Sequence, residues 1–90
     1  MVYVIAVHME EGGSGHEHIA EVKWRNPQSG DTGKATCAAM VDWIKNKAGD
    51  ARVSDGKVEA RVAVVDATPP YLRTHADGKW TNNLLALPRY

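Results

Sequence analysis

The chain has 90 residues, which is enough for one small domain. Its composition, with 43% hydrophobic and 24% charged residues, is ordinary for a folded protein. Eleven basic side chains balance eleven acidic ones, which argues against strong non-specific binding to nucleic acid. A single cysteine excludes an internal disulfide framework and a zinc site built from cysteines. Because no apolar run approaches the roughly 20 residues that span a bilayer and no signal peptide is recognisable, we expect a cytoplasmic protein with no membrane partner.

Two strands are predicted in the N-terminal third. Residues 2–9 are rich in β-branched side chains, and residues 18–26 alternate between the two faces of a half-buried strand. The glycine-rich stretch at residues 12–15 joins two strands, so it predicts a hairpin loop and not a phosphate-binding loop. The predicted register gives an almost wholly apolar face for a helix to cover, with His8 opposite His18, Ala6 opposite Ala20, Val4 opposite Val22 and Val2 opposite Trp24.

A loop is predicted over residues 26–33, followed by a helix of about 12 residues. Thr36 is the expected N-cap, and Gly49 suits the position just past the C-terminal end. Apolar side chains recur at helical spacing and should face the core: Cys37, Met40, Val41, Ile44 and Ala48.

Residues 51–54 and 57–67 flank Asp55-Gly56, which is a strong hairpin signal. The predicted fold class is therefore α+β, with a four-stranded, mainly antiparallel sheet in ββαββ order, one helix packed on one face and an extended C-terminal segment. We expect a single domain over residues 1–90. Residues 68–90 are expected to pack on the sheet or to be exchanged between subunits, in a monomer or a homodimer. Their leucines should cover an apolar outer face that holds Tyr3, Ile5, Val7 and Val65.

Three histidines lie close together at the N-terminal hairpin. His16 and His18 have the spacing that aims two imidazoles the same way on a strand, and the predicted register brings His8 beside them. A zinc-like site at His8, His16 and His18 is therefore one hypothesis. The alternative is that the three imidazoles are the polar ends of a hairpin.

The segment from residue 68 to residue 90 is dense in polar and aromatic side chains. Asp77-Gly78 predicts a turn between short strand pieces at residues 72–74 and 79–81. Aromatic side chains interleaved with cations are typical of binding surfaces. The candidate contact residues are Tyr71, Arg73, His75, Lys79 and Trp80. The alternative is structural, with Arg73 paired to a carboxylate and the leucines sealing the sheet.

The run YLRTHADGKWTNNLLALPRY, together with GHEHI upstream and MVDWIKN on the helix, resembles the bacterial family called domain of unknown function 3892. The resemblance spans nearly the whole chain. It implies a small cytoplasmic protein of bacterial or phage origin and assigns no activity. Asn82 stands where the resemblance leads us to expect Asp, which would undercut any activity that depends on that carboxylate.

The leading functional hypothesis is a small non-enzymatic binding or adaptor domain with no cofactor, which takes a protein or a small ligand on its C-terminal segment. A metal-binding protein and a nucleic-acid-binding module are the alternatives. A third hypothesis is an enzyme with His75 and Asp77 as an acid-base pair, because both lie in or near a loop. No catalytic residue is assigned, and the sequence favours a binding protein over an enzyme.

Overall fold

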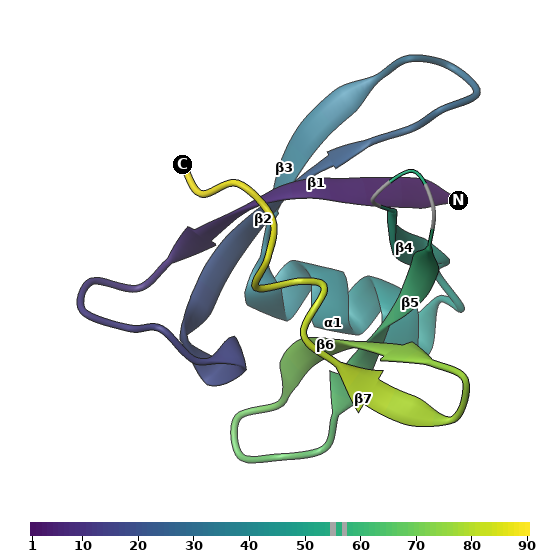
Figure 1. Cartoon of the computed structure of the whole chain (residues 1–90). Helices are drawn as coiled ribbons and strands as arrows, with labels where there is room; N and C mark the ends of the chain where they lie inside the picture. The colour runs from purple at the N-terminus through teal and green to yellow at the C-terminus, as the bar shows by residue number, and fades with distance from the viewer. Residues whose placement is uncertain (55, 57) are drawn as a thin grey trace.

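The computed structural model describes residues 1–54, 56 and 58–90 of the chain (Figure 1). One α-helix and a short 3-10 helix accompany the strands in this part of the chain. Their bounds are β1 (Val2–Met9), η1 (His16–His18), β2 (Ile19–Arg25), β3 (Thr32–Thr36), α1 (Cys37–Asn46), β4 (Ala51–Ser54), β5 (Glu59–Val65), β6 (Tyr71–Ala76) and β7 (Lys79–Thr81).

The described strands form a single mixed sheet of seven strands in the order β3-β2-β1-β4-β5-β6-β7. β1 and β4 are parallel, and the other neighbouring pairs are antiparallel. The prediction of a four-stranded sheet in ββαββ order is therefore wrong, and the protein is mostly β. The prediction missed β3 because the short strand TGKAT follows a turn-rich stretch, and it treated β6 and β7 as a covering segment outside the sheet.

The register between β1 and β2 also differs from the predicted one. Val4 lies opposite Trp24 and Ala6 opposite Lys23, so Ile5 is an extra residue in a β-bulge. A bulge shifts the alternation of side chains by one position, and Val7 consequently faces the core together with Val4. His8 pairs with Glu21 and not with His18, because the observed register is shifted by two residues from the predicted one at Val4 and by one more after the bulge.

The helix α1 largely follows the prediction. The Thr36 hydroxyl oxygen accepts a hydrogen bond from the Ala39 N–H at 3.1 Å, which confirms the expected N-cap. At the other end α1 stops at Asn46, so Ala48 is exposed and not on the core face as predicted. With φ of 53° it adopts the left-handed conformation that we expected of Gly49. Gly49 has a different role, since a Cβ there would lie 2.2 Å from Cδ2 of Trp43.

The hairpin between β6 and β7 has the predicted turn. Asp77 and Gly78 have φ values of 52° and 76°, and Ala76 pairs with Lys79 across them. Two consecutive left-handed residues in a two-residue loop are the hallmark of a type I′ turn, which suits the twist of antiparallel strands. The other predicted turn, at Asp55-Gly56, includes Asp55, which lies outside the described residues.

The C-terminal segment returns from β7 to the middle of the sheet. Figure 1 shows this segment in yellow as it passes in front of α1 in that view on its way from β7 to β1. The Val7 N–H donates to the Pro88 carbonyl oxygen at 2.9 Å, and the Tyr90 N–H donates to the Val7 carbonyl oxygen at 3.1 Å. β4 pairs with β1 at Val2 and Tyr3, and the C-terminal segment pairs with β1 further along, at Val7.

A single core connects the helix, the sheet and this segment. Leu84 is fully buried in it, and Leu85 and Leu87 pack against it in part. Tyr3 and Ile5, which the leucines were expected to cover, are half-buried, while Val7 belongs to the core. The buried members of the core are Val4, Val7, Ile19, Val22, Met40, Val41, Ala51, Val53, Val62, Leu72 and Leu84.

Leu84→Ala should lower the free energy of unfolding by about 3 kcal/mol, because it opens a cavity in a core that the rest of the segment cannot refill. Leu85→Ala, at a half-buried neighbour, is the matched control and should cost about 1 kcal/mol. Urea denaturation followed by circular dichroism measures both. Equal losses in the two variants would show that the segment does not anchor through Leu84.

Candidate functional site

Five side chains lie directly opposite one another across neighbouring strands. Tyr3 on β1 pairs with Arg52 on β4, Arg52 with Arg61 on β5, Arg61 with His75 on β6, and His75 with Trp80 on β7. At roughly 4.8 Å between strands, these four steps span about 19 Å. We call these residues the cross-strand row. It lies on the face opposite the core, since Ala51, Val53, Ala60 and Val62 alternate with its arginines and are buried.

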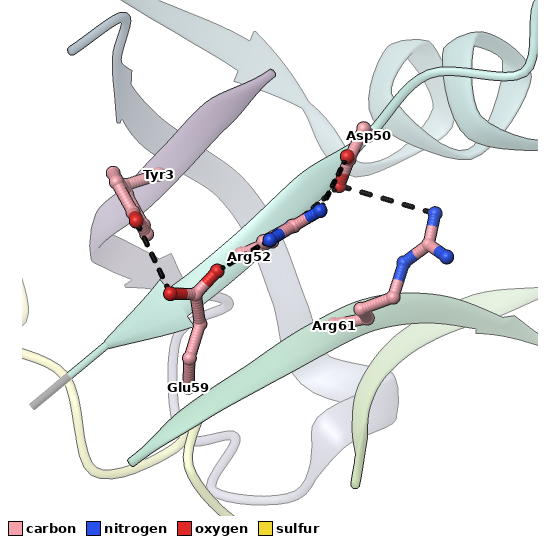
Figure 2. Close-up of polar contacts among 5 residues, drawn as sticks. All are labelled: Tyr3, Asp50, Arg52, Glu59 and Arg61. Atoms are coloured by element: carbon pink, nitrogen blue, oxygen red, sulfur yellow. Dashed lines mark hydrogen bonds and ion pairs between the residues drawn. The ribbon is translucent and has the colours of Figure 1, made fainter. Parts of the chain in front are cut away.

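One half of the row is held by ion pairs (Figure 2). The Arg52 guanidinium donates to both carboxylate oxygens of Asp50 at 2.9 Å and to Oε1 of Glu59 at 2.8 Å. The Tyr3 hydroxyl donates to Oε2 of Glu59 at 3.2 Å. The hydrogen bonds from Arg52 lower the pKa of the Asp50 carboxyl, and the two carboxylates raise the pKa of Arg52. The charge of Arg52 is therefore neutralised and its orientation fixed.

The other half of the row is open. Arg61 has a side chain 67% exposed, and its nearest carboxylate oxygen, on Asp50, is 3.9 Å away. The rings of His75 and Trp80 meet edge to face, with 5.2 Å between their centroids. Trp80 is nevertheless 46% exposed. A cation, an imidazole and an indole thus stand side by side, with the indole oriented by its neighbour.

The structure separates the five residues predicted to form a contact surface. His75 and Trp80 join the row, but Lys79 pairs with Ala76 and so projects from the other face of the hairpin. Arg73 donates to the Thr81 carbonyl oxygen at 3.2 Å and to Oδ1 of Asn82 at 3.1 Å, which braces the end of β7. Tyr71 lies at the opposite end of β6, in a groove beside α1.

Sequence reasoning missed three members of the row, namely Tyr3, Arg52 and Arg61. Each is a polar or aromatic side chain that alternates with buried residues on its own strand, which is a signal for a solvent-facing position only. Tyr3 joins the row only through the parallel pairing of β1 with β4, for which the local sequence has no signal, and Arg61 meets His75 only through the pairing of β5 with β6.

Asn82, expected to be Asp, accepts a hydrogen bond from Arg73 through its amide oxygen. The suggested acid-base pair has no matching geometry, because no hydrogen bond joins His75 to Asp77 among the described residues and His75 packs on Trp80.

The three histidines of the metal hypothesis have separate surroundings. The His8 ring bonds to the Tyr90 backbone oxygen, and Nδ1 of His18 accepts from the Gly15 N–H at 3.2 Å. His16 is buried. Over residues 1–54, 56 and 58–90, no three His, Cys, Asp or Glu side chains are grouped closely enough to hold a metal ion.

A groove of about 1100 Å³ separates α1 from η1 and from the loop before β6. Cys37 lines it, and so do residues from each of the three sequence motifs, among them His18, Asp42 and Tyr71. Burial raises the pKa of the Cys37 thiol. The thiol therefore stays protonated at neutral pH, which is unsuited to nucleophilic attack.

The fold and the cross-strand row define a small mixed-sheet domain with a polar surface that runs across five of its strands. The chain belongs to the DUF3892 family, described as proteins of unknown function, whose sequence profile matches residues 3–88. This match confirms the resemblance seen in the C-terminal run. No curated protein and no solved structure matches the chain. No helix among the described residues is long and apolar enough to cross a membrane.

His16 makes folding sensitive to acid. It is 8% exposed, and its Nε2 has no hydrogen-bond partner among the described residues. Burial, and then the nearby positive charge of Arg73, lower the pKa of this imidazole below its ordinary value of 6.5, and Glu17 offsets part of that effect. Below the ordinary value the unfolded chain takes up a proton that the folded chain resists, so stability falls with pH until the folded pKa is passed.

We expect the free energy of unfolding to decrease as the pH is lowered from about 7.5 to about 5, by at most about 1.4 kcal/mol per pH unit from this group. His16→Leu should remove that contribution, whatever its effect on stability at neutral pH. His18→Leu, which removes the other imidazole of η1, is the control and should keep it. Urea titrations at several pH values measure the slope, and an unchanged slope in His16→Leu would contradict the assignment.

Proposed function

We propose that this chain is a small non-enzymatic binding domain whose contact surface is the open half of the cross-strand row, and that its partner is a protein. The contact residues are Arg61, His75 and Trp80. The observation that supports the proposal most directly is the in-register placement of an exposed indole, an imidazole and a largely exposed guanidinium on three adjacent strands.

These side chains suit a protein interface for energetic reasons. Trp and Arg are enriched among the residues that contribute most to binding, because they bury a large area and lose few rotatable bonds. His75 already orients the Trp80 ring, so less conformational entropy is lost when a partner covers it. Regular strands also carry all three residues, which makes the surface rigid before binding.

The charges around the row favour a protein over a nucleic acid. Asp50 and Glu59 lie on the same face as Arg61, and they offset the positive charge that a phosphate backbone would need. The net charge of the chain is zero, which removes long-range attraction to a polyanion. Metal binding is a weaker candidate still, because His8, His16 and His18 each have different neighbours.

Trp80→Ala should weaken partner binding by about 30-fold, equivalent to about 2 kcal/mol, as expected for an interface hot spot. Arg61→Ala should weaken it by about 10-fold. The partner is first captured on the immobilised chain and identified by mass spectrometry. The affinity of the purified partner for each variant is then measured by calorimetry.

Arg25→Ala is the matched control, since Arg25 is an exposed arginine that pairs with Tyr3 at the far end of the row, on β2, three strands from the Arg61 strand β5. It should bind the partner like the unmodified chain. Equal affinities for all three variants would overturn the proposal. Binding to a single-stranded oligonucleotide that weakens steeply with salt and is lost in Arg61→Ala would instead support the nucleic-acid alternative.

A further inference from the structure

A second concave site lies on the helix side of the sheet, between β2, β3 and the outer surface of α1. It is an apolar cleft of about 310 Å³, a size found at the lower end of small-molecule sites. We call it the tryptophan cleft, and its lining residues are Val2, Trp24, Asn26, Ala35, Ala39, Met40 and Trp43.

Both indole walls are seated against glycines. A Cβ on Gly33 would lie 2.4 Å from Cζ2 of Trp24, and one on Gly49 would lie 2.2 Å from Cδ2 of Trp43. These approaches are possible only because glycine has no side chain. Among the described residues no ring contact joins the two indoles, so the space between them stays open. Because the backbone holds both indole rings in place, the cleft is formed before a ligand binds.

Apart from the indole N–H groups of Trp24 and Trp43, the only polar side chain that the described residues place in the lining is that of Asn26. Its Oδ1 accepts hydrogen bonds from the backbone N–H groups of Gln28 at 2.9 Å and Ser29 at 3.4 Å. This identifies the other amide atom as Nδ2, a donor that bonds to no described residue. No charged side chain lines the cleft. A charged ligand would therefore lose its hydration without a compensating partner.

We propose that the tryptophan cleft binds a small, neutral, flat aromatic compound of about two fused rings that carries one hydrogen-bond acceptor. Its rings pack against Trp24 and Trp43 over the apolar floor of Met40, and its acceptor takes the free N–H of Asn26. The site is independent of the protein-binding surface, because its lining residues lie on β1, β2, β3 and α1 and just after β2, and none of them belongs to the cross-strand row.

The probe for this site is 2-naphthamide, with the indole N–H signals of the protein followed by NMR. The chain has three tryptophans. We expect the signals of Trp24 and Trp43 to shift with a dissociation constant of about 1 mM or tighter, as for a fragment-sized ligand, and the signal of Trp80 to stay in place. No shift, or a shift of Trp80 alone, would overturn the proposal.

A cleft-filling variant tests the location. Ala39 lies on α1 and lines the cleft, whereas its neighbour Ala38 faces the groove, and both are exposed. Ala39→Met should weaken binding at least tenfold by occupying the space. Ala38→Met adds the same side chain to the same helix and should leave the affinity unchanged. Equal affinities in the two variants, with equal melting temperatures, would refute the site.

Two further comparisons test the chemistry of the ligand. The anion 2-naphthoate should bind at least tenfold more weakly than 2-naphthamide, because the cleft has no opposite charge to replace its hydration. Asn26→Asp keeps the oxygen that caps the turn and removes the donor, so it should weaken 2-naphthamide but not naphthalene, which has no acceptor. Tighter binding of the anion, or an equal loss for both neutral probes, would overturn the assigned role of Asn26.

Discussion

β1 forms backbone pairs with three neighbours, and the rest of the structure depends on this pairing. Along one edge it pairs with β2. Along the other, Val2 and Tyr3 pair with β4, while Val7 pairs with the chain near Arg89. The bulge at Ile5 lies between these two contacts, and a bulge bends a strand and increases its twist. The bend lets one short strand serve both β4 and the C-terminal segment, and it directs Val4 and Val7 into the same core.

Both candidate sites follow from this arrangement. The parallel pairing of Tyr3 with Arg52 adds β1 to the side chains that antiparallel pairing aligns on β4, β5, β6 and β7, which completes the cross-strand row over five strands. Trp24 pairs with Val4 on one neighbouring strand and with Gly33 on the other. Because Gly33 has no side chain, the indole can pack against the backbone of β3. The two sites differ in character because they lie on opposite faces. The row is polar and ion pairs hold one half of it, whereas the tryptophan cleft is apolar and lies against α1.

Features that depend on a few consecutive residues were predictable. Thr36 caps α1, and Asp77-Gly78 turns the β6–β7 hairpin, as the sequence indicates. The family resemblance was predictable from the C-terminal run, and the match to DUF3892 confirms it. Of the five predicted contact residues, only His75 and Trp80 lie in the cross-strand row, and these two share one hairpin. The sequence of β6 predicts that Tyr71 and Arg73 lie on the face opposite its buried residues. It does not predict their contacts, because Arg73 bonds to the end of β7 and Tyr71 lines a groove beside α1.

The sequence by itself determined the helix and its cap, the tight turn of the last hairpin, the strand character of β1, β2, β4 and β5, and the family. These features are local, since hydrogen bonds and φ preferences within a few residues decide them. Only the tertiary structure decided the seven-strand order, the bulge at Ile5, the burial of Leu84, and the meeting of Arg61 with His75 and Trp80. Strand pairing between distant segments is chosen by the packing of the whole core, and a single extra residue in β1 reverses which side chains face it.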